Sequence, residues 1–436
     1  MKRAELLLKE WKGDSYAFGE GVLKEVGPFA ARFGKSALII VADLGEGWVQ
    51  EPLEEVKDSL GREGVSFEAV SGARPNAPRE DLYRIALQVE KARPASIIAL
   101  GGGSTIDAAK AASVLASYSP PEVEKCFPEA GAEASSIEPF FGTDTVTKIR
   151  DATGRGIIPV VAIQTAASSA AHLTKYSNIT DPVSGQKKLI VDEAIVPPAA
   201  LFDFNVTLGT PKDLTLDGGL DGIAHSWEVL MGAVGKPFYG KAKEIAELSI
   251  RLIVKSLPMA VRDGSDREAR TALGLGTDLG GYAIMVGGTS GGHLGSFSLV
   301  DVLSHGRACA VLNPYYTVLF APAIEEPLRI AGAIYKEAGF IDVPLEGLKG
   351  MELGGAVARG MIEFSRSLGF PTTLKEAGAS TAHIERMVAA AKNPQLRSKL
   401  ENMPLPMYVD KGDVDRLMKP TLEAAFTGGL KSIPNP

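Results

Sequence analysis

Cysteine is scarce in this 436-residue sequence, in which only Cys126 and Cys309 occur. Two isolated cysteines with no paired spacing indicate neither a disulfide framework nor a cysteine-based zinc site. Long apolar runs are also missing, so we expect no membrane-spanning helix. The first apolar stretch, Leu6–Leu8, is followed at once by Lys9 and is too short for the core of a signal peptide. We therefore expect a protein of the reducing cytoplasm.

Positive charge is also in short supply. The chain has 46 Lys and Arg against 53 Asp and Glu, for a formal net charge of -7, and its basic residues form no cluster. This charge distribution lacks the basic patch of a protein that binds nucleic acid or an anionic membrane. The length and the 45% hydrophobic content suit two domains of common size. We expect a small-molecule substrate as the partner, and a homodimer.

The first half of the chain alternates short apolar runs with stretches that have helical spacing. The runs cover residues 37–41, 65–70, 96–100 and 157–163. Continuous, β-branched runs of this length are typical of parallel strands buried on both faces. The alternation predicts an α/β domain with a parallel, Rossmann-like sheet.

The second half has few strand-like runs and many helical spacings. From about Pro211 onward the pattern predicts an all-α domain, and prolines before it mark the junction. We place the α/β domain at residues 1–205 and the helical domain at 206–436. Residues 117–153 are rich in Pro, Gly, Ser and acidic residues, which predicts a long surface excursion.

A glycine-rich turn follows the apolar run 96–100 and opens a helical stretch. Glycines let the backbone approach a pyrophosphate, and the helix N-terminus offers it free N–H groups. The turn consists of Gly101, Gly102, Gly103 and Ser104. Asp43, just past the run 37–41, can accept hydrogen bonds from an adenosine ribose and would repel a 2′-phosphate. The pattern favours NAD(H) over NADP(H), and domain 1–205 as the dinucleotide-binding domain.

Only five histidines occur: His172, His225, His293, His305 and His383. Asp221 and His225 are four residues apart in a stretch that can form a helix, so both side chains can reach one ion. An open metal site needs three or four N/O ligands. Asp221, His225, His293 and His305 are a suitable set for Fe(II) or Zn(II).

Three segments together resemble the iron-containing alcohol dehydrogenase family, within the dehydroquinate synthase-like superfamily. Residues 101–110 resemble its GGGSxxDxAK nucleotide-binding turn, residues 221–225 its DxxxH metal motif, and residues 305–314 its HGxAxAxLLP segment. The resemblance extends over most of the chain. It implies that domain 206–436 is the metal-binding, catalytic domain, and that Asp221, His225, His293 and His305 act through the metal.

The resemblance also implies the reaction and the cofactor contacts. We expect an NAD(P)-linked alcohol dehydrogenase or aldehyde reductase, in which hydride passes between the nicotinamide and a substrate that the metal holds. The expected cofactor-binding residues are Asp43, Asn76, Gly101, Gly102, Gly103, Ser104, Thr165, Ser169 and Lys187.

Two segments depart from the family pattern. Residues 164–172 read QTAASSAAH where the family has a segment like PTTAGTGSE, so His172 stands in place of a glutamate. We predict that His172 borders the nicotinamide or substrate pocket, the alternative being a partly buried structural histidine. The family's HxxxH segment begins here at His293, but Phe297 takes the place of the second histidine.

Two other functions remain as alternatives. One is a non-redox cyclase or lyase similar to dehydroquinate synthase, which would recycle bound NAD; the segment 305–314 argues against it. The other is a nucleotide-binding protein that has lost catalysis. The four metal-ligand candidates argue against that alternative, because an idle site does not need them.

Overall fold

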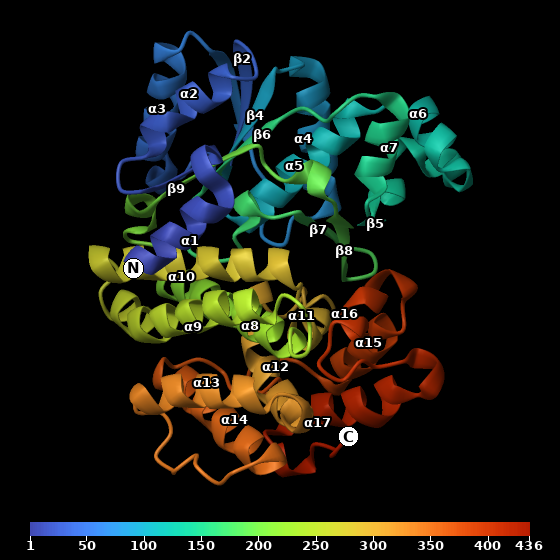
Figure 1. Ribbon diagram of the computed structural model, residues 1–436. Coiled ribbons are helices and arrows are strands. Elements are labelled where there is room, and N and C mark those ends of the chain that lie inside the picture. The colour runs from blue at the N-terminus through green and yellow to red at the C-terminus, as the bar shows by residue number, and fades with distance from the viewer. The chain divides into compact units, whose positions relative to one another are not determined.

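The computed structural model describes the backbone of residues 1–436 and all side chains except those of residues 395 and 398. The chain forms two compact units (Figure 1). The α/β unit consists of Lys9–Ala166 and Ala170–Leu208. The helical unit consists of Met1–Leu8, Ala167–Ser169 and Gly209–Pro436. Helix α1 (Lys2–Lys12) contributes residues to both.

A six-stranded parallel sheet forms the centre of the α/β unit, as the alternating pattern predicts. In spatial order its strands are β1 (Tyr16–Gly19), β9 (Ala199–Asp203), β6 (Val160–Gln164), β4 (Ser96–Gly101), β2 (Ser36–Val41) and β3 (Ser66–Ser71). Four of them match the expected runs. The pairing of Val41 with Leu100 and of Gly101 with Gln164 brings the carboxyl ends of β2, β4 and β6 to one edge.

Side chains alternate across β2 and so enter two different hydrophobic clusters. Leu38 and Ile40 belong to the cluster that contains residues of α4 (Arg79–Ala92) and α5 (Gly103–Ser117). Ala37, Ile39 and Val41 belong to the cluster with residues of α2 (Val26–Ala31) and α3 (Gly47–Arg62). Helices therefore cover both faces of the sheet, which explains why β2 is apolar throughout (Figure 1).

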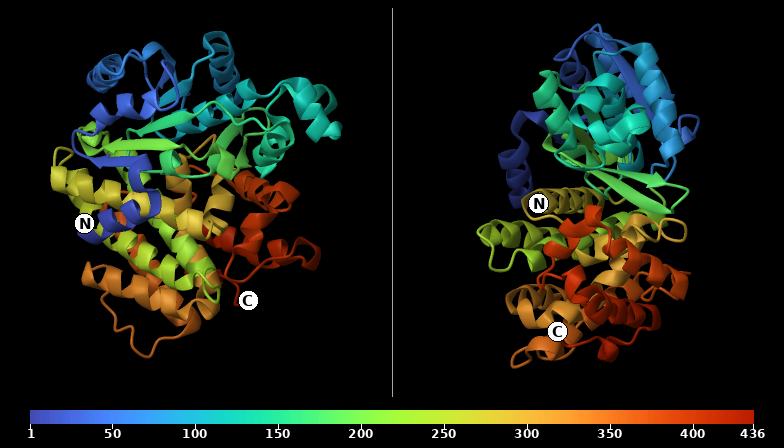
Figure 2. Two further views of the ribbon diagram at one scale, coloured as in Figure 1. Left: turned by 45° about the horizontal axis from the view of Figure 1, so that its top comes forward. Right: turned by 90° about the vertical axis from the view of Figure 1, so that its right-hand side faces the viewer.

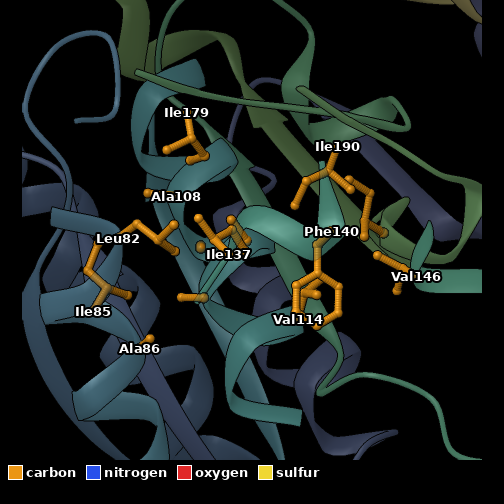
Figure 3. Packing of buried hydrophobic residues seen from close by; sticks show 14 of the residues in the cluster. Leu82, Ile85, Ala86, Ala108, Val114, Ile137, Phe140, Val146, Ile179 and Ile190 are labelled. Carbon is orange, nitrogen blue, oxygen red and sulfur yellow. The ribbon is translucent and has the colours of Figure 1, made fainter. Parts of the chain in front are cut away.

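The expected surface excursion at residues 117–153 is wrong in part, because this segment folds onto the core. It contains α6 (Pro120–Cys126), β5 (Gly142–Thr143) and α7 (Thr145–Thr153). Ile137, Phe140 and Val146 are fully buried, beside Val114 of α5 and Ile190 (Figure 3). A small second sheet pairs β5 with β8 (Gln186–Val191), which pairs in turn with β7 (Tyr176–Asp181). The apolar residues of segment 117–153 are scattered among Pro, Gly and acidic residues without a regular period, so periodicity did not predict their burial.

The helical unit contains ten labelled α-helices after residue 209, drawn in yellow-green to red in Figures 1 and 2. They are α8 (Lys212–Gly232), α9 (Tyr239–Arg262), α10 (Arg267–Val286), α11 (Gly291–Ser296), α12 (His305–Phe320), α13 (Glu325–Glu337), α14 (Gly350–Ser367), α15 (Thr381–Ala391), α16 (Arg397–Glu401) and α17 (Lys419–Thr427). Their predominance confirms the expected helical second half. Among the described residues, none of the helices is both long and apolar enough to cross a membrane.

Candidate active site

Helix α8 holds Asp221 and His225 inside the helical unit, where both are 3% exposed. The helix is buried on nearly every side, and glycines let its neighbours approach. A Cβ at Gly222 would lie 2.9 Å from atoms of both Ile253 and Thr277. The four-residue spacing then directs the carboxylate and the imidazole to the same side of the helix.

Two further helices bring His293 and His305 to the same place. His293 lies in the short helix α11, and His305 is the first residue of α12. A Cβ at Gly306 would be 2.1 Å from the carbonyl oxygen of Asp217 in α8. Only glycine at position 306 therefore lets the start of α12 pack this closely against α8.

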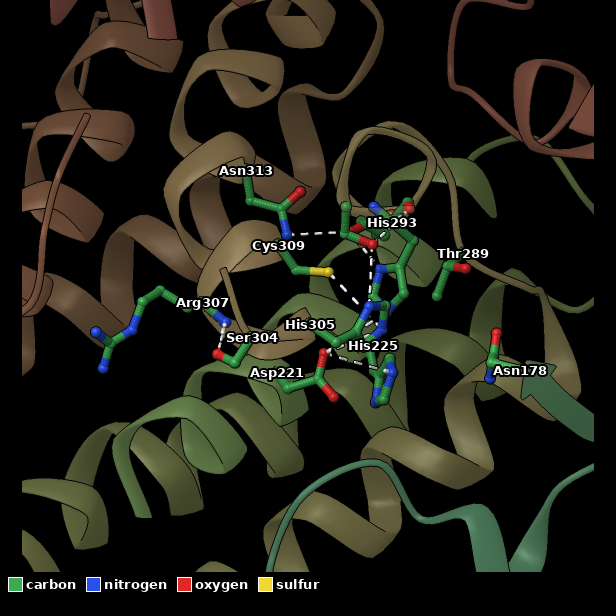
Figure 4. A network of polar contacts seen from close by, with 12 residues as sticks. Asn178, Asp221, His225, Thr289, His293, Ser304, His305, Arg307, Cys309 and Asn313 are labelled. Atoms are coloured by element: carbon green, nitrogen blue, oxygen red, sulfur yellow. Dashed lines mark hydrogen bonds and ion pairs between the residues drawn. The ribbon is translucent and has the colours of Figure 1, made fainter. Parts of the chain in front are cut away.

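The four side chains converge around one oxygen atom (Figure 4). Asp221 Oδ1 lies 3.8 Å from His225 Nε2, 3.7 Å from His293 Nε2 and 3.8 Å from His305 Nε2. These distances are long for hydrogen bonds. Two ligands of one tetrahedral ion, each about 2.0–2.2 Å from it, are about 3.4 Å apart. The donor set and its spacing thus fit a divalent metal ion.

Hydrogen bonds orient two of the imidazoles with Nε2 toward this centre. His293 Nδ1 is 2.8 Å from Glu228 Oε1, and His305 Nδ1 is 3.0 Å from Ser296 Oγ. Glu228 is 1% exposed and also accepts hydrogen bonds from the Ser290 backbone (2.7 Å) and Asn313 Nδ2 (3.1 Å). A carboxylate behind a metal-binding histidine fixes its tautomer and orientation.

Burial keeps the third imidazole neutral. The pKa of His225 is lowered to about 4, chiefly by loss of solvent; the Glu228 carboxylate opposes this shift and the Lys399 charge adds to it. Only the neutral ring offers a nitrogen lone pair to a metal. His225 is therefore ready to act as a ligand at neutral pH.

Sequence reasoning missed two residues of this centre. Glu228 lies two turns after Asp221 on α8, and Cys309 lies one turn after His305 on α12. The spacing of each from a predicted ligand, seven and four residues, could have indicated both. Phe297 is 2% exposed and stacks on His305, with ring centroids 6.1 Å apart and an interplanar angle of 7°. His383 accepts a hydrogen bond from the Ser380 backbone at the start of α15, a capping role.

The predicted phosphate-binding turn joins β4 to α5 in the α/β unit. Gly101 ends β4, Gly102 is the N-cap, and Gly103 begins α5. A Cβ at Gly101 would lie 2.8 Å from Thr105 Cβ and 2.9 Å from Ala42 Cβ, whereas one at Gly102 would meet nothing within 4 Å. Gly101 is thus required by packing, and Gly102 faces open space.

Other predicted cofactor residues lie near this turn. Ser104 Oγ accepts a hydrogen bond from the Asn76 backbone (3.0 Å), and the Thr165 backbone donates one to Gly101 (3.2 Å). Asp43 follows β2, the neighbour of β4, and is exposed with φ +51°. The α/β unit therefore assembles these residues at the carboxyl edge of its sheet.

The other two predicted cofactor residues belong to other segments of the chain. Lys187 lies in β8, opposite Thr180 of β7, and is 8% exposed. Ser169 belongs to the short segment that is part of the helical unit.

His172 does not line a pocket, contrary to the prediction. It is 0% exposed, with Nε2 3.2 Å from the Tyr16 hydroxyl and its ring edge-on to Phe202. Burial, together with the charges of Lys12 and Lys110, holds its pKa well below the ordinary value. These contacts favour the alternative, a structural histidine.

Comparison with known proteins places the chain in a class. A model described as iron-containing alcohol dehydrogenase matches residues 14–204, and one for the C-terminal part of that family matches residues 215–418. The matched segments cover most of the chain and define an oxidoreductase that acts on CH–OH groups. The protein belongs to the iron-containing alcohol dehydrogenase family.

Individual relatives are distant but match along nearly their whole length. An NAD-dependent methanol dehydrogenase from Bacillus methanolicus is 25% identical, over 86% of this chain and 90% of that protein. A 1,3-propanediol dehydrogenase from Citrobacter freundii is also 25% identical, over 86% and 89%. The structure of an alcohol dehydrogenase from Oenococcus oeni has a TM-score of 0.77 and 23% identity, and the similarity covers 95% of this chain and 98% of that one. That likeness confirms the predicted fold.

Proposed function

We propose that this dehydrogenase holds one divalent metal ion, Fe(II) or Zn(II), with Asp221, His225, His293 and His305. One observation carries the proposal: Asp221 Oδ1 lies 3.7–3.8 Å from the Nε2 atoms of all three histidines. Three imidazole nitrogens and one carboxylate suit Fe(II) or Zn(II) better than Mg(II) or Ca(II), which prefer oxygen ligands.

We further propose that NAD(H) binds in preference to NADP(H). The proposed contacts are Asp43, Asn76, Gly101, Gly102, Gly103, Ser104, Thr165, Ser169 and Lys187. The exposed carboxylate of Asp43 supports the preference, because it would accept hydrogen bonds from ribose and repel a 2′-phosphate. The NAD-dependent methanol dehydrogenase of Bacillus methanolicus supports it as well.

A metal held by these four residues would supply a Lewis acid for the oxygen of an alcohol or aldehyde, and bound NAD(H) would supply the hydride acceptor or donor for the substrate carbon. The protein's part is to prepare the ligands. Glu228 and Ser296 fix the rings of His293 and His305, and burial keeps His225 neutral. Phe297 covers one face of His305 and excludes water there.

Turnover and metal content, measured on the same preparation, test the proposed function. We expect stoichiometric Fe or Zn and formation of NADH from a panel of small primary alcohols, with slower reduction of NADP. A chelator should abolish turnover, and Fe(II) or Zn(II) should restore it. Full activity in metal-free protein would refute the metal proposal, and faster reduction of NADP would refute the cofactor preference. Metal-bound protein without any turnover would favour the non-redox or non-catalytic alternative.

We also propose a homodimer in a reducing cytoplasm. The scarcity of cysteine supports the compartment. Light scattering would measure the mass in solution, and a monomer would refute the dimer. Fractionation of cells from the source organism would test the compartment, and recovery outside the cytoplasmic fraction would contradict it.

A further inference from the structure

Cys309 faces the same centre as the four proposed ligands. It lies one helical turn after His305, so the side chains of both project from one side of α12. Cys309 is fully buried, and Figure 4 shows its sulfur directed toward the histidine cluster. The pair repeats on α12 the spacing of Asp221 and His225 on α8.

The distances allow the sulfur to share an ion with Asp221, His293 and His305. Cys309 Sγ is 4.0 Å from His305 Nε2, and ligand atoms of Asp221, His293, His305 and Cys309 all lie within 4.8 Å of one another. On a five-coordinate zinc ion, with bonds of about 2.3 Å to sulfur and 2.0–2.1 Å to nitrogen, neighbouring ligand atoms are up to about 3.8 Å apart. Shifts of a few tenths of an ångström to about 1 Å close the difference.

We propose that Cys309 is a further ligand of the ion held by Asp221, His225, His293 and His305. This inference rests on the proposed function, since it assumes that those four residues bind a metal. On binding, the thiol releases its proton to solvent and the sulfur donates an electron pair to the ion. Because thiolate is a soft donor, Cys309 also biases the site toward Zn(II) over Fe(II).

Cobalt substitution tests the proposal without an activity assay. Purified, metal-depleted protein is loaded with Co(II), and its near-ultraviolet and visible spectra are recorded for wild type, Cys309→Ser and Cys126→Ser. Cys126 lies in α6 of the α/β unit and is the matched control. We expect a thiolate-to-cobalt charge-transfer band in wild type and Cys126→Ser. In Cys309→Ser we expect that band to disappear while the ligand-field bands remain.

A second measurement needs no variant, in case Cys309→Ser fails to fold. X-ray absorption of zinc-loaded wild type should show one sulfur at about 2.3 Å from the metal. Bound Co(II) or Zn(II) with only N/O donors would overturn the role of Cys309 and leave the proposed function intact. Failure of the wild type to bind either ion would overturn both.

Discussion

Glu228 allows the sharpest test of how the metal centre is built. Its two oxygens accept hydrogen bonds from His293 Nδ1 at 2.8 Å, Asn313 Nδ2 at 3.1 Å and the Ser290 backbone at 2.7 Å. A glutamine at position 228 has the same shape but only one acceptor oxygen. If its amide nitrogen faces His293, Nδ1 must become the acceptor and the proton moves to Nε2, which then cannot bind a metal. If the amide nitrogen faces Ser290 instead, it meets the Ser290 backbone N–H, and two hydrogen-bond donors oppose each other.

We therefore expect Glu228→Gln to weaken metal binding while leaving the fold intact. A hydrogen bond to a charged group contributes about 1.5–3 kcal/mol, which corresponds to a roughly 10- to 150-fold loss in metal affinity. In the metal-free protein, Glu228→Gln loses a hydrogen bond but also removes the cost of burying the Glu228 charge, so the two effects offset each other. The free energy of unfolding should thus change by no more than about 1 kcal/mol.

Competition with a chromophoric chelator measures the Zn(II) affinity, and denaturant unfolding of the metal-free protein measures stability. Glu244→Gln is the matched control, since Glu244 pairs with Arg3 on the surface of the helical unit. Unchanged Zn(II) affinity in Glu228→Gln would refute the positioning role. If Glu228→Gln lost as much free energy of unfolding in the metal-free protein as it lost in Zn(II) binding, the role of Glu228 would be merely structural.

Three further predictions concern the ligands and the cofactor. Single alanine variants of the four proposed ligands should lose at least about a hundredfold in activity, measured by NADH formation, whereas His383→Ala should keep full turnover. The four ligands are Asp221, His225, His293 and His305. Asp43→Gly, which suits the positive φ there, should shift the NADH-to-NADPH ratio of kcat/KM by about tenfold toward NADPH; a wild type that already prefers NADPH would contradict this. Gly101→Ala should lower the free energy of unfolding by about 1–3 kcal/mol through overpacking. Gly102→Ala should change the free energy of unfolding by no more than about 1 kcal/mol. It should, however, weaken NADH binding, which fluorescence titration measures. Unaltered NADH affinity in Gly102→Ala would contradict the prediction that the diphosphate binds at this turn.

The sequence predicted best those elements whose surroundings are uniform. Strands β2 and β4 are buried on both faces, so they read as continuous apolar runs. Strand β1 has only four residues and lies at an edge of the sheet. In β8 a glutamine and two lysines precede only three apolar residues, and the strand belongs to a small second sheet. Strand β9 was also missed, although all five of its residues are buried, because it directly follows Pro197 and Pro198, which indicated a domain junction.

Dependence on local patterns also explains which residues of the metal centre could be predicted. The proposed ligands were selected by residue type and spacing together with the resemblance to family motifs. Glu228 acts through His293, which lies 65 residues further along the chain. Its seven-residue spacing from Asp221 indicates the shared side of α8 but not this partner. His172 shows the opposite error. Its place in a family segment suggested a pocket, but the neighbouring aromatic rings of Tyr16 and Phe202 enclose it.

Helical spacing connects the two unusual residues of the centre, Phe297 and Cys309. Each stands four residues after a proposed ligand, Phe297 after His293 and Cys309 after His305. At position 297, where the family pattern has a second histidine, the phenyl ring offers no donor and instead packs parallel to His305. At position 309, the thiol lies 4.0 Å from His305 Nε2. His305 is thus bordered by an apolar ring and by a sulfur donor. If Cys309 binds the ion, a sulfur donor on α12 takes the place of the nitrogen donor that is absent at position 297, directly after α11. Phe297→His should then place nitrogen at the centre without removing the charge-transfer band of Cys309.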